Sequence, residues 1–156
     1  LEALKHIHGR GVIHCDLKLD NMLAHQEEDD TFPIIKLCDF GLAHKIDSKY
    51  GNKALKKTTV GTWGYIAPES HKNKYIGRET DMWSFGLTLY EMAVAYKPTQ
   101  VKGYEYDKGD LPFCPRDWRG RSKELQDLIL ACMEMNPKKR ISAEDALQHP
   151  YFSTEV

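Results

Sequence analysis

Four polar residues stand close together in the sequence, in an order that suits chemistry on a phosphate group. Asp16, Lys18 and Asn21 lie in one short stretch, and Asp39 follows at the start of an Asp–Phe–Gly triplet. A carboxylate can orient an attacking hydroxyl, a lysine can offset phosphate charge, and amide and carboxylate oxygens can hold magnesium on the phosphates. The residue types and their order therefore predict phosphoryl transfer from magnesium-bound ATP.

Helices are predicted to position these residues. Residues 79–96 carry large apolar side chains on nearly every face, as is typical of a helix in the centre of a fold. Residues 1–8, the turn that begins at Pro68 and the segment after Ser142 are also predicted to be helical. A further helix is predicted after Ser122, which can cap its first turn. Its apolar face would consist of Leu125, Leu128, Ile129, Cys132 and Met133.

Short β-branched and apolar runs predict three small strands, at residues 12–13, 22–24 and 34–37. Residues 42–60 are polar, lysine-rich and without periodicity, so they are predicted to form a mobile loop. Residues 97–109 contain one proline and two glycines, which disfavour a full helix. The fold class predicted for residues 1–156 is α+β and mainly α-helical, with short β-ribbons at the catalytic edge.

The composition indicates a single soluble domain. The chain has 156 residues, of which 41% are hydrophobic, and its net charge is −1. That charge gives no field to attract nucleic acid or a membrane surface. The apolar runs are also far shorter than the roughly 20 residues that a membrane helix needs. We therefore expect neither nucleic acid nor a membrane as a partner, and the oligomeric state stays open.

The cysteine and histidine patterns predict no structural metal. Four cysteines stand without a C-x-x-C pair, so neither a disulfide framework nor a zinc site is indicated. His6 and His8 are two residues apart on a predicted helix and would point to different faces. This cysteine usage indicates a reducing compartment, the cytoplasm or the nucleus.

Three motifs together carry a resemblance to a known family. The stretch His–Cys–Asp–Leu–Lys–Leu–Asp–Asn at residues 14–21 is followed by Asp–Phe–Gly at 39–41 and Ala–Pro–Glu at 67–69. This order resembles the protein kinases, whose signatures read H-R-D-L-x-x-x-N, D-F-G and A-P-E. A lone H-x-D is common, but the full series with an apolar helix opening at Asp81 is not expected by chance.

The resemblance implies a role for each polar residue. Asp16 would orient the substrate hydroxyl and accept its proton, while Lys18 would reach the transferring γ-phosphate. Asn21 and Asp39 would hold magnesium, so the implied cofactors are ATP and Mg²⁺. Leu23 falls where the family packs an apolar side chain under the adenine ring.

The resemblance also implies a substrate class. Lys18 and the segment Gly–Thr–Trp–Gly–Tyr at 61–65 are similar to serine/threonine kinases, whereas tyrosine kinases usually have alanine and arginine in the catalytic loop. Thr62 would hydrogen-bond near Asp16 and Lys18. A protein serine or threonine hydroxyl is the substrate that these positions imply.

Four further residues are implied to have structural roles. His14 opens the first motif. Glu69 would pair with Arg140, which matches the arginine before the final helices of kinases. If that pair is buried, loss of one partner would cost about 3–5 kcal/mol. Asp81 falls where the family has a buried aspartate that anchors the catalytic loop.

One position departs from the family pattern. Cys15 stands where most kinases have the arginine that clamps a phosphorylated activation loop, so this chain would be a non-RD kinase. We hypothesise that its activation depends less on loop phosphorylation than in relatives with arginine. Thr58 and Thr59 are the candidate phosphorylation sites of the activation segment, residues 39–69. The alternative that they are ordinary loop threonines stays open.

The resemblance covers the C-terminal lobe of a kinase domain. The sequence has no glycine-rich loop before the first motif and no strand lysine for the ATP phosphates. We therefore expect the missing kinase N-lobe to be a partner of this chain, the fragment alone to be inactive, and an apolar face to be exposed where that lobe would pack. The alternative function is a non-catalytic pseudokinase or half-kinase that acts as a protein-binding scaffold.

Overall fold

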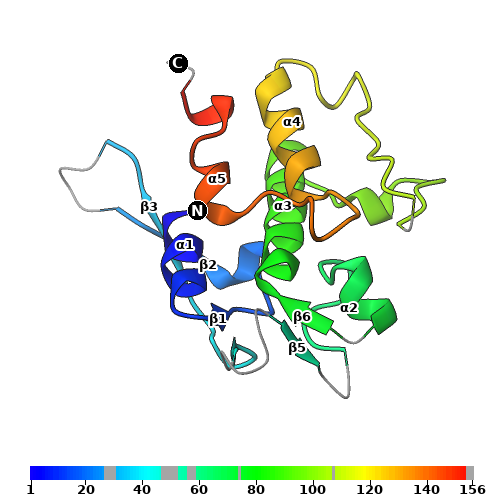
Figure 1. Ribbon diagram of the computed structural model, residues 1–156. Coiled ribbons are helices and arrows are strands. Elements are labelled where there is room, and N and C mark those ends of the chain that lie inside the picture. The colour runs from blue at the N-terminus through cyan, green and yellow to red at the C-terminus, as the bar shows by residue number, and fades with distance from the viewer. Residues whose placement is uncertain (27–30, 47–52, 56–58, 74, 107, 154–156) are drawn as a thin grey trace.

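A long central helix with shorter helices around it forms the body of the protein (Figure 1). The computed structural model describes residues 1–26, 31–46, 53–55, 59–73, 75–106 and 108–153. The α-helices are α1 (Glu2–Gly9), α2 (Pro68–Asn73), α3 (Arg78–Val94), α4 (Lys123–Cys132) and α5 (Ala143–Ala146). Single 3₁₀ turns are η1 (Leu19–Asn21), η3 (Pro98–Gln100) and η4 (Pro150–Phe152).

The strands form three antiparallel pairs at the edge of the helical body. The strand β1 (Val12–Ile13) pairs with β4 (His44–Lys45), and β5 (Lys53–Leu55) pairs with β6 (Tyr75–Gly77). The strands β2 (Met22–His25) and β3 (Ile34–Leu37) form a hairpin in which Leu23 lies opposite Lys36. The pair β1–β4 brackets residues 14–43, which carry the first two motifs, and the pair β5–β6 brackets residues 67–69, which carry the third.

Helix α3 is the centre of the hydrophobic core, as its sequence predicts. Trp83, Leu87 and Tyr90 pack on one side of it with Trp118. Met82 and Phe85 pack on the other side, in a second cluster with residues of α1, α4 and α5. The helix ends at Val94, two residues before the predicted end, because Ala95 adopts a left-handed backbone with φ of 63°.

Helix α4 begins as predicted, because the Ser122 hydroxyl accepts a hydrogen bond from the Leu125 N–H at 3.1 Å. It packs closely on α3 at Gly86. A Cβ atom there would lie 2.7 Å from Met133 Cγ and 2.8 Å from Cys132 Cβ. Glycine therefore allows the two helices to approach more closely than any larger residue would.

The prediction for residues 42–60 was wrong in part. Among the described residues of this segment, 44–45 and 53–55 are strands, paired with β1 and β6. Strands of two or three residues carry no periodicity of their own, and their pairing depends on partners far away in the sequence. The prediction for residues 97–109 was confirmed, because their only helical element in the described residues is the short turn η3.

All four cysteines carry free thiols. Among the helices that the structure describes, none combines the length and the apolar character that a bilayer crossing requires.

Candidate active site

The loop formed by residues 14–21 is anchored by a buried carboxylate of α3. Asp81 is 1% exposed, and it accepts hydrogen bonds from the backbone N–H groups of His14 at 2.8 Å and Cys15 at 2.9 Å. The Nε2 atom of His8, on α1, lies 2.8 Å from the same carboxylate. Two consecutive backbone donors are thus held by one side chain, which fixes the start of the loop.

His14 connects this loop to the Asp–Phe–Gly turn. The ring is fully buried, its Nδ1 atom lies 3.3 Å from the Asp16 N–H nitrogen, and its Nε2 atom lies 3.0 Å from the Cys38 carbonyl oxygen. Nδ1 must therefore accept and Nε2 must donate, which fixes the neutral tautomer protonated at Nε2. The ring also packs against Phe40, with the two centroids 4.9 Å apart.

Asp16 is the centre of a dense polar cluster. Its Oδ1 atom accepts hydrogen bonds from the Thr62 N–H at 2.8 Å and the Thr62 hydroxyl at 2.6 Å. Its Oδ2 atom lies 3.2 Å from Lys18 Nζ and 3.3 Å from Asn21 Nδ2. Lys18 Nζ also donates to the Thr62 hydroxyl at 2.8 Å. The structure thus brings Asp16, Lys18, Asn21 and Thr62 together.

This cluster keeps Asp16 ionised. Burial alone would raise the pKa of the carboxyl group, but the hydrogen bonds from Thr62 and the charge of Lys18 outweigh it, so the pKa of Asp16 is lowered. The group is therefore a carboxylate at neutral pH, next to a lysine cation and a threonine hydroxyl.

Asp39 lies at the edge of this cluster. The Cys38 N–H donates to the Asn21 carbonyl at 3.0 Å, which places the following residue beside the loop. Asp39 itself is exposed, has a φ of 57°, and accepts a hydrogen bond from the Gly41 N–H at 3.1 Å. In the described part of the chain, no contact joins its carboxylate to the Asn21 side chain. Leu23 is 56% exposed on β2.

The segment that carries Thr62 packs tightly on the 14–21 loop. Gly61 has a φ of 109°, and a Cβ atom there would lie 2.6 Å from the Cys15 carbonyl oxygen. Any other residue would be strained by its backbone angle and would collide with the loop. Thr59 is exposed, whereas Thr58 lies outside the described residues.

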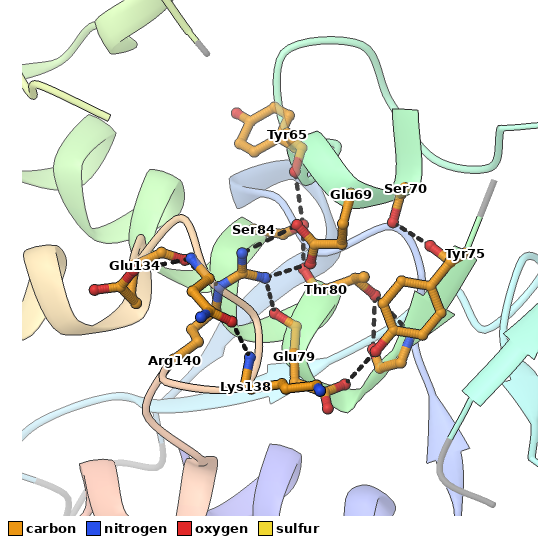
Figure 2. Close-up of polar contacts among 12 residues, drawn as sticks. Tyr65, Glu69, Ser70, Tyr75, Glu79, Thr80, Ser84, Glu134, Lys138 and Arg140 are labelled. Carbon is orange, nitrogen blue, oxygen red and sulfur yellow. Dashed lines mark hydrogen bonds and ion pairs between the residues drawn. The ribbon is translucent and has the colours of Figure 1, made fainter. Parts of the chain in front are cut away.

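Glu69 and Arg140 form a buried ion pair (Figure 2). Arg140 Nη1 lies 2.5 Å from one Glu69 oxygen and Nη2 lies 3.0 Å from the other. The guanidinium also donates to the carbonyl oxygens of Glu79 at 2.7 Å and Glu134 at 2.9 Å. Both residues are less than 9% exposed. This arginine therefore connects α2, the start of α3 and the segment that follows α4.

Two polar contacts near the site have no clear signal in the sequence. His8 reaches Asp81 across 73 positions, and only its spacing of four residues from the buried Leu4 indicates that it faces inward. The Tyr65 hydroxyl donates a hydrogen bond to the Glu91 carboxylate. The pKa of Tyr65 is raised, mainly by burial and also by this carboxylate.

The described residues contain no group of three histidine, cysteine or acidic side chains that could hold a metal ion.

Comparison with known proteins identifies the family. The protein kinase domain model matches residues 1–152. The chain therefore belongs to the protein kinase family.

Its relatives include several fungal and mammalian kinases. It is 36% identical over 98% of its length to calcium/calmodulin-dependent protein kinase cmkB of Emericella nidulans. It is 39% identical over 99% of its length to serine/threonine-protein kinase cds1 of Schizosaccharomyces pombe, and 36% identical over 97% to serine/threonine-protein kinase D3 of mouse. The chain spans 38%, 34% and 17% of the lengths of these three relatives, respectively.

Proposed function

We propose that this chain is the C-terminal lobe of a serine/threonine protein kinase, which transfers the γ-phosphate of Mg-ATP to a protein hydroxyl. The observation that carries the proposal is the Thr62 hydroxyl, which bridges Asp16 Oδ1 at 2.6 Å and Lys18 Nζ at 2.8 Å. A hydroxyl between a carboxylate and an ammonium is the arrangement that a substrate serine or threonine needs next to these groups. The names of the relatives support the same substrate class.

The chemistry of Asp16 favours orientation of the substrate over early proton removal. Because its pKa is lowered, the carboxylate is a weak base. It can align the substrate hydroxyl from the start and receive the proton late, when the bond to phosphorus has largely formed. Lys18, already 3.2 Å from the carboxylate, would offset the charge of the transferring phosphate.

Asn21 and Asp39 have suitable atoms for magnesium. The side-chain nitrogen of Asn21 donates to Asp16, and its side-chain oxygen Oδ1, the kind of atom that magnesium requires, has no hydrogen-bond partner among the described residues. Asp39 adds an exposed carboxylate. Bound magnesium–ATP would supply the phosphoryl group, and the metal would neutralise part of the phosphate charge. Leu23, exposed on β2, would pack under the adenine.

The exposed apolar surface of the β2–β3 hairpin supports a partner lobe. Leu23 and Ile34, each 56% exposed, lie on one face of the hairpin, and Ile35, 50% exposed, lies on the other. Phe40 and Leu42, which follow β3 in the chain, are 45% and 44% exposed. A preceding N-lobe with a glycine-rich loop and a phosphate-binding lysine would cover this surface and complete the ATP cleft. The lobe by itself would have negligible turnover. Residues 39–69 would form the activation segment, and the free cysteines suit the cytoplasm or nucleus.

The test is phosphoryl transfer by the complete kinase domain. Asp16→Ala and Asp39→Ala should each lower the rate by at least about 100-fold, because each removes a charge at the reacting phosphate. Asp127→Ala, which removes an exposed acid on α4, is the control and should leave the rate unchanged. Wild-type rates in either site variant would refute these roles.

A protein-binding scaffold is the second candidate. The same exposed apolar hairpin favours it, together with the cysteine at position 15. A complete domain that binds its partner with unchanged affinity and transfers no phosphate would support the scaffold.

A further inference from the structure

A pocket lies between α1, the start of α3 and the loop before α5, and none of the candidate catalytic residues lines it. Its volume is about 400 Å³. Cationic groups outnumber acids in its lining. The cations belong to Lys5, Arg78, Lys138 and Arg140, and the acids to Glu79 and Glu144.

Two of these cations are already paired. All three nitrogens of the Arg140 guanidinium donate to protein oxygens, as Figure 2 shows for its bonds to Glu69, Glu79 and Glu134. Lys5 Nζ lies 3.4 Å from a carboxylate oxygen of Glu144. These two groups therefore complete the pocket wall and leave little charge for a ligand.

Arg78 and Lys138 are different. The Arg78 Nε atom is buried without a hydrogen-bond partner, and no ion pair of its guanidinium or of Lys138 Nζ is found among the described residues. The nearby Glu79 carboxylate accepts the Tyr75 hydroxyl at 3.0 Å instead. A buried donor without a partner is costly, and proteins rarely keep one unless a ligand or water satisfies it.

We propose that this pocket binds a phosphate group through Arg78 and Lys138. The planar guanidinium offers paired donors that match two phosphate oxygens, and the ammonium adds a point charge. The volume exceeds what one phosphate fills, and Met82, Pro137 and Ile141 supply an apolar wall beside the cations. The ligand is therefore a phosphorylated serine or threonine within a protein segment, whose neighbouring side chain covers that wall.

The test is a titration of the protein followed by two-dimensional NMR. The probes are inorganic phosphate, a short phosphoserine peptide with a leucine after the phosphoserine, and the same peptide without phosphate. Phosphate should shift the backbone amide signals of Gly9, Ile141 and Ala143. Arg78→Met and Lys138→Met should each weaken binding by about tenfold, the loss expected for one charge-assisted contact.

Matched variants make the result specific. Lys123→Met removes an exposed lysine of α4 outside the pocket and should leave the affinity unchanged. Arg78→Lys should keep part of the affinity. If Arg78→Met does not fold, as circular dichroism would show, Lys138→Met carries the test alone, because its exposed side chain has no described partner to lose.

The proposal is overturned if both pocket variants bind phosphate as the wild type does, or if phosphate shifts only the signals around Thr62. Peptide binding at least about tenfold tighter than that of inorganic phosphate identifies a phosphorylated segment as the ligand. Equal affinities identify a free phosphate site instead. No phosphoryl transfer is needed for this assay, so its result does not depend on the proposed catalytic function.

Discussion

Removing the cation of the buried Glu69–Arg140 ion pair is expected to cause a large loss of stability. Arg140→Met keeps the length of the side chain and removes the charge. Glu69, 8% exposed, would then be a buried carboxylate without its cation, and the carbonyl oxygens of Glu79 and Glu134 would each lose a donor. Breaking a buried pair in this way costs about 3–5 kcal/mol.

That loss should be visible in thermal and urea unfolding. For a chain of this size each kcal/mol lowers the melting temperature by about 2–4 °C, so we expect a fall of roughly 6–20 °C. Arg116→Met is the matched control, because Arg116 is paired with Asp117 while its side chain is 89% exposed. It should leave the midpoint unchanged.

A double variant separates the lost pair from lost packing. Adding Glu69→Gln to Arg140→Met removes the uncompensated charge and should recover at least about 1 kcal/mol. The reasoning is refuted if Arg140→Met lowers the unfolding free energy by less than about 1 kcal/mol, the value of a surface pair. It is also refuted if the double variant is no more stable than the single one.

Three further predictions address acid stability, helix packing and regulation. Because the pKa of Asp16 is lowered in the folded state, its contribution to stability is complete above the ordinary value of 3.8 and is lost as the pH falls through the lower folded value. The urea midpoint of Asp16→Asn should therefore depend less on pH below 3.8 than the midpoint of the wild type does. Gly86→Ala should cost about 1–3 kcal/mol in urea unfolding, since the new methyl collides with α4. Replacing both Thr58 and Thr59 with alanine should leave the complete kinase active, because Cys15 cannot bind a phosphate as arginine does; loss of activity in a phosphorylation assay would contradict this.

Local patterns were sufficient to predict most of the helical body. Residues 78–94 form a helix because their apolar side chains recur around the whole helix, and that signal extends over many turns. Ser122 marks the start of α4 because its hydroxyl satisfies a backbone N–H of the first turn. The residue at which α3 ends was harder to predict from the sequence, because Ala95 adopts a left-handed conformation that its residue type does not favour.

Long-range contacts were not visible in local patterns. The short strands β4 and β5 exist because β1 and β6 offer them backbone partners, and nothing in residues 42–60 indicates those partners. The contact between Thr62 and Asp16 spans 46 positions, and only the resemblance to the protein kinases predicted it. The order of the motifs indicates which residues meet, whereas tertiary packing decides how closely they meet.

The buried Asp81 carboxylate stabilises a strained backbone turn in the loop formed by residues 14–21. Cys15 has a φ of 68°, a left-handed conformation that costs a residue with a side chain of the order of 1–3 kcal/mol. The Asp81 carboxylate accepts two consecutive N–H groups of this turn, and hydrogen bonds to a charged group contribute about 1.5–3 kcal/mol each. The two bonds together outweigh the strain, so the carboxylate selects the backbone shape that points Asp16 toward Thr62 and Lys18. Burial of a charge under the loop is therefore a requirement of the geometry of the site above it.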